Sequence, residues 1–193
     1  MKLFGTSLKS IRDEDLMAQV KDKDTAAFEE LYNRYSKVIL HFLYKMLGGS
    51  EAQAQDFLHD IFLKIIEKPY LFDPSKKFKT WIFQIAHNKC KNEYRKKDIR
   101  NQAKVEFELK EMYSQNSTSP DTKMDFKSMK EIINQELSKY EEKHYSTFVL
   151  RYQHELSIKE IAEISDCPEG TVKSRLFYVT QKLVDKMKDF HQN

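Results

Sequence analysis

The sequence is poor in the two residues that break helices, with 4 glycines and 4 prolines in 193 residues. About a third of its residues are charged (33%), and runs of β-branched residues are few. This composition favours helices over a β-sandwich or a doubly wound sheet. The length fits one domain or two small ones. We therefore expect an all-α protein.

Cysteines and long apolar runs are also scarce. The 2 cysteines, Cys90 and Cys167, lie far apart in a sequence with no recognisable secretory signal, which argues for a reducing compartment and against a disulfide scaffold. No apolar run approaches the roughly 20 residues that a membrane span needs. The sequence predicts a soluble, cytoplasmic protein.

Residues arranged for catalysis are missing as well. There is no glycine-rich phosphate loop, and the scattered carboxylates fall mostly at solvent-facing helical positions. His87 and Cys90 share one helix face at i, i+3, but a structural zinc site needs about four ligands and no second pair is near in sequence. We expect no enzyme, no cofactor, no metal and no small-molecule substrate.

Positive charge is modest in total but concentrated locally. The formal net charge is only +3, yet residues 76–97 hold eight lysines and arginines against Glu93 alone. The arrangement of charge says more about nucleic-acid binding than its total. This segment is the basic part of the chain.

Helical periodicity begins in two capped segments near the N-terminus. Asp13 and Asp24 are placed to cap the first two helices, and Gly48-Gly49 to end the second, long one.

Two further helices complete a first unit. Ser50, with Gln53 three residues on, predicts a capping box for the third helix, which Pro69 ends. The fourth begins at Thr80 or a neighbour, with Trp81 inward, and runs into the basic segment. Residues 11–98 therefore predict a bundle of about four helices.

A polar stretch separates this bundle from a second helical unit. The pattern weakens over residues 99–125, where "SQNSTSPD" carries no apolar stripe, and we interpret this part as a flexible linker. Periodicity resumes over residues 126–190. The prediction is two small helical domains joined by a flexible linker.

The second unit contains a helix-turn-helix pattern. Ser157 and Glu160 form a capping box at the start of "SIKEIAEI", "SDC" predicts a tight turn, and Pro168 suits the first position of the next helix. The first turns of such a second helix enter the major groove of DNA. Hydrogen-bonding and cationic residues occupy those turns: Glu169, Thr171, Lys173, Ser174 and Arg175. A solvated helix start whose charges only aid solubility fits the same pattern.

Two segments resemble one family in the right order. "YSTFVLRYQHELSIKEIAEISDCPEGTVKSRLFYVTQKL" closely resembles region 4 of bacterial extracytoplasmic-function (ECF) sigma factors of the sigma-70 family. "AFEELYNRYSKVILHFLYKMLGGSEAQAQDFLHDIFLKII" and "FKTWIFQIAHNKCKNEYRKK" resemble region 2. The resemblance implies an alternative sigma factor that binds core RNA polymerase and directs promoter-specific initiation. Regions 2 and 4 would be residues 11–98 and 126–190.

The resemblance also implies sites and partners. Residues for the minus-35 element would be Thr171, Lys173, Ser174, Arg175 and Phe177. Residues for the minus-10 element would be Phe72, Phe78, Lys79, Asn88, Lys89, Lys91, Asn92, Arg95 and Lys96. Core polymerase would be bound at its β′ clamp by Asp56, His59, Asp60 and Lys64, and region 4 would meet the β flap. An anti-sigma factor, often membrane-anchored in this family, is a further implied partner.

The implied recognition helix departs from the family at one point. Members usually continue this helix with several arginines, whereas "FYVTQKL" supplies Tyr178 and Thr180. Fewer phosphate contacts would weaken the salt dependence of minus-35 binding.

Two rival functions fit part of the pattern. A two-domain helix-turn-helix regulator could bind an operator without polymerase, although a sensor bundle has no need for the basic helix over residues 78–97. A protein-binding adaptor that has lost DNA activity is the third reading.

Overall fold

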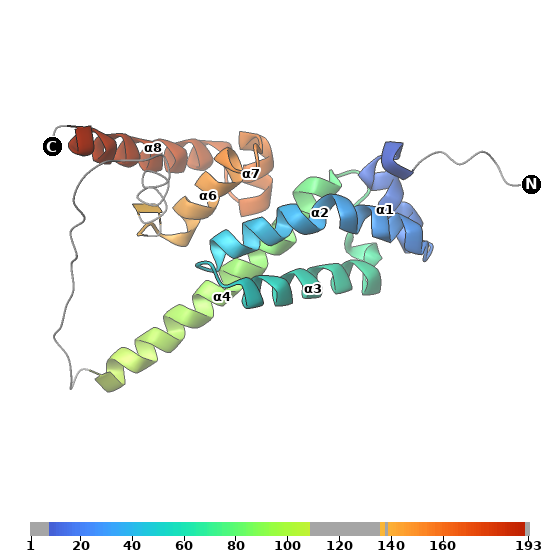
Figure 1. The fold of residues 1–193 in the computed structure, drawn as a ribbon, viewed down its shortest axis with the longest axis horizontal. Helices are drawn as coiled ribbons and strands as arrows, with labels where there is room; N and C mark the ends of the chain where they lie inside the picture. The colour runs from blue at the N-terminus through green and yellow to red at the C-terminus, as the bar shows by residue number, and fades with distance from the viewer. Residues whose placement is uncertain (1–7, 109–135, 138, 192–193) are drawn as a thin grey trace, which may run out of the picture.

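The computed structural model describes residues 8–108, 136–137 and 139–191, and the part of the predicted linker from residue 109 onward lies outside them. Within these ranges the regular structure is helical, with no strand. The helices form an N-terminal bundle and a C-terminal unit (Figure 1). The all-α prediction is confirmed.

The N-terminal bundle has four α-helices, and α2 packs against both α1 and α3. Its elements are η1 (Leu8–Ser10), α1 (Asp13–Lys21), α2 (Thr25–Met46), α3 (Glu51–Glu67), η2 (Pro69–Leu71) and α4 (Phe78–Glu108). Its centre is aliphatic and aromatic, with Phe42, Phe78 and Phe83 among its largest fully buried side chains. The apolar stripes read from the sequence meet in this core.

The predicted caps of the first two helices differ in outcome. Asp24 caps α2 as predicted, because its carboxylate accepts the Ala26 and Ala27 N–H groups at 2.8 and 3.1 Å. The prediction for Asp13 is wrong, because Asp13 is the first residue of α1 and the N-cap position belongs to Arg12, whose side chain makes no capping hydrogen bond. The Asp13 carboxylate instead binds Arg34 of α2 at 2.6 Å. A tertiary ion pair has replaced a local cap.

The start of α4 is fixed by a contact distant in sequence. The helix begins at Phe78, two residues before the predicted Thr80. The Phe78 N–H donates to the Glu14 carboxylate of α1 at 3.0 Å. Acceptors at a helix N-terminus satisfy amides that have no intrahelical partner.

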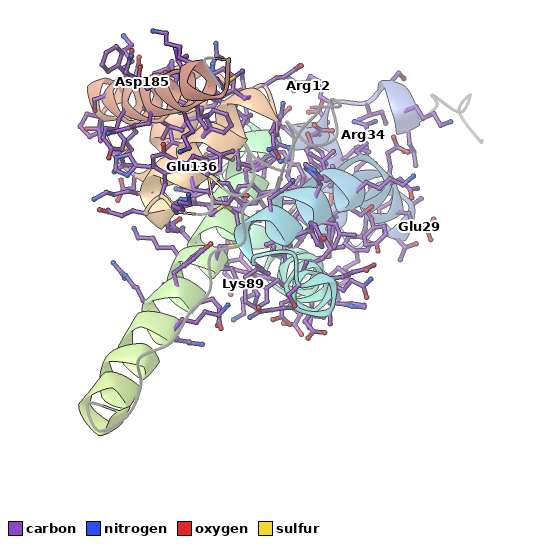
Figure 2. All side chains as sticks on the ribbon, turned by 60° about the vertical axis from the view of Figure 1, so that its left-hand side comes forward. Arg12, Glu29, Arg34, Lys89, Glu136 and Asp185 are labelled. Carbon is purple, nitrogen blue, oxygen red and sulfur yellow. The ribbon has the colours of Figure 1, made fainter. Side chains whose placement is uncertain are left out.

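α4 also runs further than the sequence analysis places it. It continues to Glu108, so that residues 99–108, assigned above to the linker, are helical. The segment "IRNQAKVEFE" has neither glycine nor proline, so nothing in it ends a helix. The far half of α4 projects away from both units (Figures 1 and 2).

The C-terminal unit consists of α6 (Glu142–Tyr152), α7 (Ile158–Ser165) and α8 (Glu169–His191). α8 packs against both α6 and α7. Val172 and Val179 of α8 are fully buried, as are Val149 and Leu150 of α6. The short helix α7 depends on this packing, because eight residues are too few for a stable isolated helix.

The two units are packed together, with α7 on α4 and α6 on α2 (Figures 1 and 2). One continuous group of buried side chains includes Ile39 and Phe83 of the bundle and Leu156 and Ile161 of the C-terminal unit. We call this arrangement the closed arrangement. The sequence left the relative placement of the domains undecided.

None of the helices in the described part of the chain is long and apolar enough to cross a membrane.

Candidate nucleic-acid interface

The helix-turn-helix is built by α7, a three-residue turn and α8. Ser157 and Glu160 form the predicted capping box, with the Glu160 N–H on the Ser157 hydroxyl at 3.2 Å and the Ser157 N–H on the Glu160 carboxylate at 2.9 Å. Asp166 closes α7 in the left-handed conformation, with φ of 49°. Pro168 lies just before α8, one position earlier than predicted, and its carbonyl accepts the Thr171 N–H at 2.9 Å. The turn thereby fixes the direction of α8.

α8 presents most of the predicted minus-35 residues on its outer face. Lys173, Ser174 and Phe177 are exposed, and Phe177 shows 70% of its surface to solvent. Thr171 and Arg175 are half-buried, and Arg175 donates to the Cys167 sulfur at 3.8 Å. An exposed aromatic ring beside a lysine and a hydroxyl is suited to a DNA groove. The assignment of these residues to DNA stays a prediction.

The residue that departs from the family, Tyr178, has a partner within the C-terminal unit. Its ring lies 6.0 Å from that of Tyr140 and 5.2 Å from that of His144. Tyr178 thus packs on the segment before α6 and on α6 itself. At this position the recognition helix has an aromatic contact within the C-terminal unit in place of the arginine that is usual in the family.

The predicted minus-10 aromatics are mostly internal. Phe78 is fully buried and Phe72 is 6% exposed, with ring centroids 5.8 Å apart. The Trp81 ring is half-buried and lies 5.2 Å from that of Phe72. The Phe78 ring also lies 5.1 Å from that of Tyr35 in α2 and 5.8 Å from that of Trp81, so it is packed between the loop residue Phe72 and the helices α2 and α4. Phe78 is therefore closed to a base in this arrangement.

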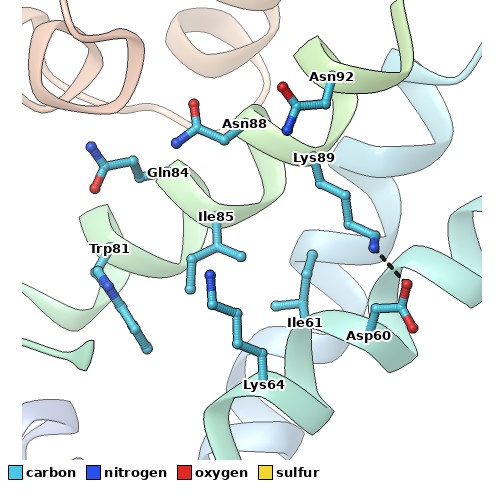
Figure 3. Close-up of a pocket in the computed structure, with 9 residues that line it drawn as sticks. All are labelled: Asp60, Ile61, Lys64, Trp81, Gln84, Ile85, Asn88, Lys89 and Asn92. Carbon is cyan, nitrogen blue, oxygen red and sulfur yellow. Dashed lines mark hydrogen bonds and ion pairs between the residues drawn. The ribbon is translucent and has the colours of Figure 1, made fainter. Parts of the chain in front are cut away.

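The amide candidates border a groove between α3 and α4, which we call the α3–α4 groove (Figure 3). Its volume is about 380 Å³. Asn88, Lys89 and Asn92 of α4 line it beside Trp81, and Asp60 and Lys64 of α3 line the opposite side (Figure 3). The structure thus brings together residues predicted for the minus-10 element and residues predicted for polymerase.

One of these lysines is already paired. The Lys89 ammonium lies 2.5 Å from the Asp60 carboxylate and 4.6 Å from the centre of the Phe57 ring (Figure 3). In the closed arrangement Lys89 therefore ties α4 to α3. By contrast, Arg95 and Lys96 are exposed and form no ion pair with a described carboxylate, and Lys79 and Lys91 are half-buried.

The predicted polymerase-binding residues share the outer surface of α3. Asp56, His59, Asp60 and Lys64 are all exposed. Exposed apolar residues that the sequence analysis did not name lie on and beside the same helix. Leu63 and Ile66 are 52% and 51% exposed, and Tyr70 in η2 is 65% exposed. Leu63 falls off the buried stripe of α3, and this spacing is the signal that could have identified it.

Polar contacts between the two units accompany the apolar packing. His87 of α4 faces Glu142 of α6 at 3.3 Å, and both are largely buried. The Gln84 amide donates to the Glu163 carbonyl of α7 at 3.2 Å. No local sequence signal marks these pairs, which bring together residues more than 50 positions apart.

A further ion pair joins the bundle to the helix-turn-helix. The Lys77 ammonium lies 3.1 Å from the Glu160 carboxylate. Burial alone would raise the pKa of Glu160, but hydrogen bonds from Ser157 and the charge of Lys77 lower it to about 2. Glu160 therefore serves the capping box and the closed arrangement together.

His87 and Cys90, the pair that the sequence analysis considered and set aside as metal ligands, are internal. His87 is 4% exposed, and Cys90 is fully buried, which raises the pKa of its thiol to about 12. Across the described residues, no three histidine, cysteine or carboxylate side chains are grouped so as to hold a metal.

Comparison with known proteins agrees with this division into two units. The family model for sigma-70 region 2 matches residues 31–99, and that for sigma-70 region 4 matches residues 146–181. A solved complex of CnrH with the cytosolic domain of CnrY covers 92% of this chain and 97% of its own, with a TM-score of 0.66 at 22% identity. The sigma factor RpoE of Bartonella quintana, solved with the anti-sigma factor NepR, gives a TM-score of 0.60 at 18% identity over 83% of this chain and 96% of its own. These two likenesses establish the fold.

Sequence relatives extend the match over nearly the whole chain. The ECF RNA polymerase sigma factor SigW of Bacillus subtilis is 33% identical over 177 residues, which cover 89% of this chain and 94% of that protein. The ECF RNA polymerase sigma-E factor of Escherichia coli is 26% identical over 190 residues, covering 93% and 96%. The chain therefore belongs to the ECF RNA polymerase sigma factors of the sigma-70 family.

Proposed function

We propose that this sigma factor reads the minus-35 element through α8, reads and opens the minus-10 element through α4 and the loop before it, and binds core polymerase through α3. The observation that carries the proposal is the exposed Lys173, Ser174 and Phe177 at the start of α8, in a chain whose α4 also exposes cations. Phosphate contacts position a protein on DNA and base contacts specify the sequence. Two such surfaces in one chain fit a promoter with two elements.

The α3–α4 groove supports the minus-10 assignment. Asn88 and Asn92 offer amides one turn apart, Trp81 offers an aromatic face, and Arg95 and Lys96 supply exposed charge. Unstacked bases are held by hydrogen bonds to their edges and by aromatic stacking beside a basic surface. We assign Phe72 and Phe78 to the support of the loop, and contact with a base to the residues of the groove.

The outer surface of α3 supports polymerase binding. Asp56 and His59 are exposed, and Leu63 and Ile66 add an apolar component of the kind that protein interfaces bury. This surface stays accessible in the closed arrangement because α6 and α7 pack on α2 and α4, and α8 packs on α6 and α7. Polymerase can therefore dock before the two units separate.

Promoter binding requires the closed arrangement to open. Two promoter elements about one and a half helical turns apart are separated by about 50 Å of DNA. The 27 residues from 109 to 135 can reach at most about 90 Å at 3.3 Å per residue. The connection is long enough for both contacts at once, whereas in the closed arrangement the two units are in direct contact.

An anti-sigma factor is a second proposed partner. The solved RpoE of Bartonella quintana is bound to the anti-sigma factor NepR. We infer that a protein of that kind holds this chain in the cytoplasm until its promoters are needed. Tagged protein purified from uninduced cells should bring down one additional small protein; recovery of polymerase subunits alone would contradict this.

Run-off transcription with purified core polymerase tests the main proposal. Reactions with and without this protein on randomised promoter fragments should give specific initiation only when it is present, and the selected sequences would reveal both elements. Duplex binding by the protein alone, without initiation, would favour a helix-turn-helix regulator that acts without polymerase. We propose no catalytic role for the chain.

A further inference from the structure

A second groove, of about 580 Å³, lies where the two units meet. It is lined by α2, by Lys79 at the start of α4, and by the turn Gln153, His154 and Glu155 after α6. We call it the junction groove. It shares no lining residue with the α3–α4 groove, and its volume is typical of small-molecule sites.

The charges around the junction groove are unbalanced. Lys37 and Lys79 line it and form no ion pair with a described carboxylate. Arg34 also lines it, but Asp13 and Glu30 neutralise this guanidinium at 2.6 and 2.8 Å. Glu155 is the one carboxylate in the lining. Two lysines against one glutamate leave the groove positive.

Buried polar atoms with no partner are found in the same lining. His154 is 9% exposed, and its Nε2 has no hydrogen-bond partner. The Gln153 Oε1 is also buried without one. Buried polar groups are nearly always satisfied, so unpaired ones suggest a missing ligand. Both atoms are closed to solvent, so each side chain would have to turn toward the groove to meet an anion; a neutral imidazole protonated on Nε2 and the Gln153 amide nitrogen would then donate to it.

The electrostatics of His154 agree with a positive groove. Its burial, followed by the charges of His41 and Lys79, lowers the pKa of the imidazole to about 4. Burial is the larger cause, and the neighbouring positive charge adds to it. A negative ligand would relieve this repulsion.

We propose that the junction groove binds a small phosphate-bearing anion, held by Lys37 and Lys79 from the N-terminal bundle and by His154 from the C-terminal unit. A phosphate group accepts several charge-assisted hydrogen bonds, as this set of donors requires. Because the ligand contacts both units, it stabilises the closed arrangement. If the proposed function holds, the same ligand opposes promoter binding.

Calorimetry and thermal unfolding of the full chain with pyrophosphate test the proposal, with ATP as a second probe. At a pyrophosphate concentration ten times Kd, the unfolding temperature should rise by about 3 to 6 °C. Sodium sulfate at matched ionic strength should give a much smaller shift. Binding by both probes would indicate recognition of phosphate alone, and binding by ATP alone would indicate that the nucleoside contributes.

Substitutions distinguish a specific binding site from nonspecific electrostatic attraction. Lys37→Gln and His154→Phe should each weaken binding about tenfold, since each removes one donor to a charged group. Phenylalanine retains the packing of His154 against Phe83, whose ring lies 5.0 Å away. Lys68→Gln removes the same charge from an exposed residue outside the groove and should change Kd less than twofold.

Three results would overturn the proposal. The first is no binding of either probe, and the second is an equal loss of probe affinity in Lys68→Gln and Lys37→Gln. The third is a rise of the unfolding temperature with oligonucleotides but not with small phosphates. The last would make the groove a nucleic-acid contact. The assay contains neither polymerase nor promoter, so its failure leaves the sigma function intact. Failure of transcription would likewise leave measured anion binding standing.

Discussion

Acid should open the closed arrangement through His154. This side chain follows α6, yet its ring contacts lie in the N-terminal bundle, with His41 at 5.5 Å, Phe42 at 5.8 Å and Phe83 at 5.0 Å. Opening exposes the imidazole to water, where its pKa returns to the ordinary 6.5, whereas it is about 4 in the closed arrangement. Above pH 6.5 the imidazole is neutral in both arrangements. As the pH falls below 6.5, protonation favours the open arrangement, and the stabilisation of the closed arrangement is progressively lost toward pH 4.

The magnitude follows from these two pKa values. Between pH 7 and pH 5 the closed arrangement should lose about 2 kcal/mol, and the limit below pH 4 is about 3 kcal/mol. A change of about 2 kcal/mol shifts the ratio of closed to open molecules roughly 25-fold. An arrangement closed in nearly all molecules at pH 7 would then be measurably open at pH 5.

Single-molecule energy transfer measures both populations. Dyes at Ala52 of α3 and Lys182 of α8, both exposed, report on the two units. His154→Phe keeps an aromatic ring in place but cannot titrate, so the difference between it and the parent isolates His154 from His41 and His87 at the same junction. An equal pH response in parent and variant, or a parent ratio that changes less than threefold between pH 7 and pH 5, would refute the reasoning.

Three further predictions concern single residues. Lys173→Ala should weaken binding of the polymerase complex to minus-35 DNA by about 1 to 3 kcal/mol if the lysine contacts a base edge; Lys159→Ala on α7 is the matched control, and equal losses in a filter-binding assay would remove Lys173 from the site. Ser157→Ala should lower the free energy of unfolding by about 1 kcal/mol through loss of the capping box, as measured by urea denaturation; an unchanged midpoint would show that the cap is dispensable. Gly49→Ala should also destabilise the fold by about 1 kcal/mol, because Gly49 has φ of +83°; a raised melting temperature in calorimetry would contradict this.

Local chemistry accounts for the parts of the fold that the sequence analysis predicted. The helical spacing of apolar residues, Asp24 before α2 and the Ser157–Glu160 box before α7 act within a few residues of one another. The helix-turn-helix was predictable for the same reason, because its turn and caps are contiguous in sequence. The cap predicted at Asp13 was wrong because a residue distant in sequence, Arg34, forms an ion pair with this carboxylate.

The candidate site was predictable in its chemistry and less so in its geometry. The helical periodicity of α8 was enough to predict that its outer face exposes Lys173, Ser174 and Phe177. The burial of Phe78 beneath Trp81 and the pairing of Lys89 with Asp60 depend on how α1, α3 and α4 pack, and periodicity does not reveal that packing.

By itself the sequence determined the helical class, the helix-turn-helix, the family and the concentration of positive charge, because each resides in short-range pattern or composition. Only the tertiary structure decided that the two units pack together, that α4 continues into the predicted linker, and that Lys37, Lys79 and His154 surround one groove. These features arise between residues far apart in the chain. Their contacts depend on the packing of whole helices, which no single segment encodes.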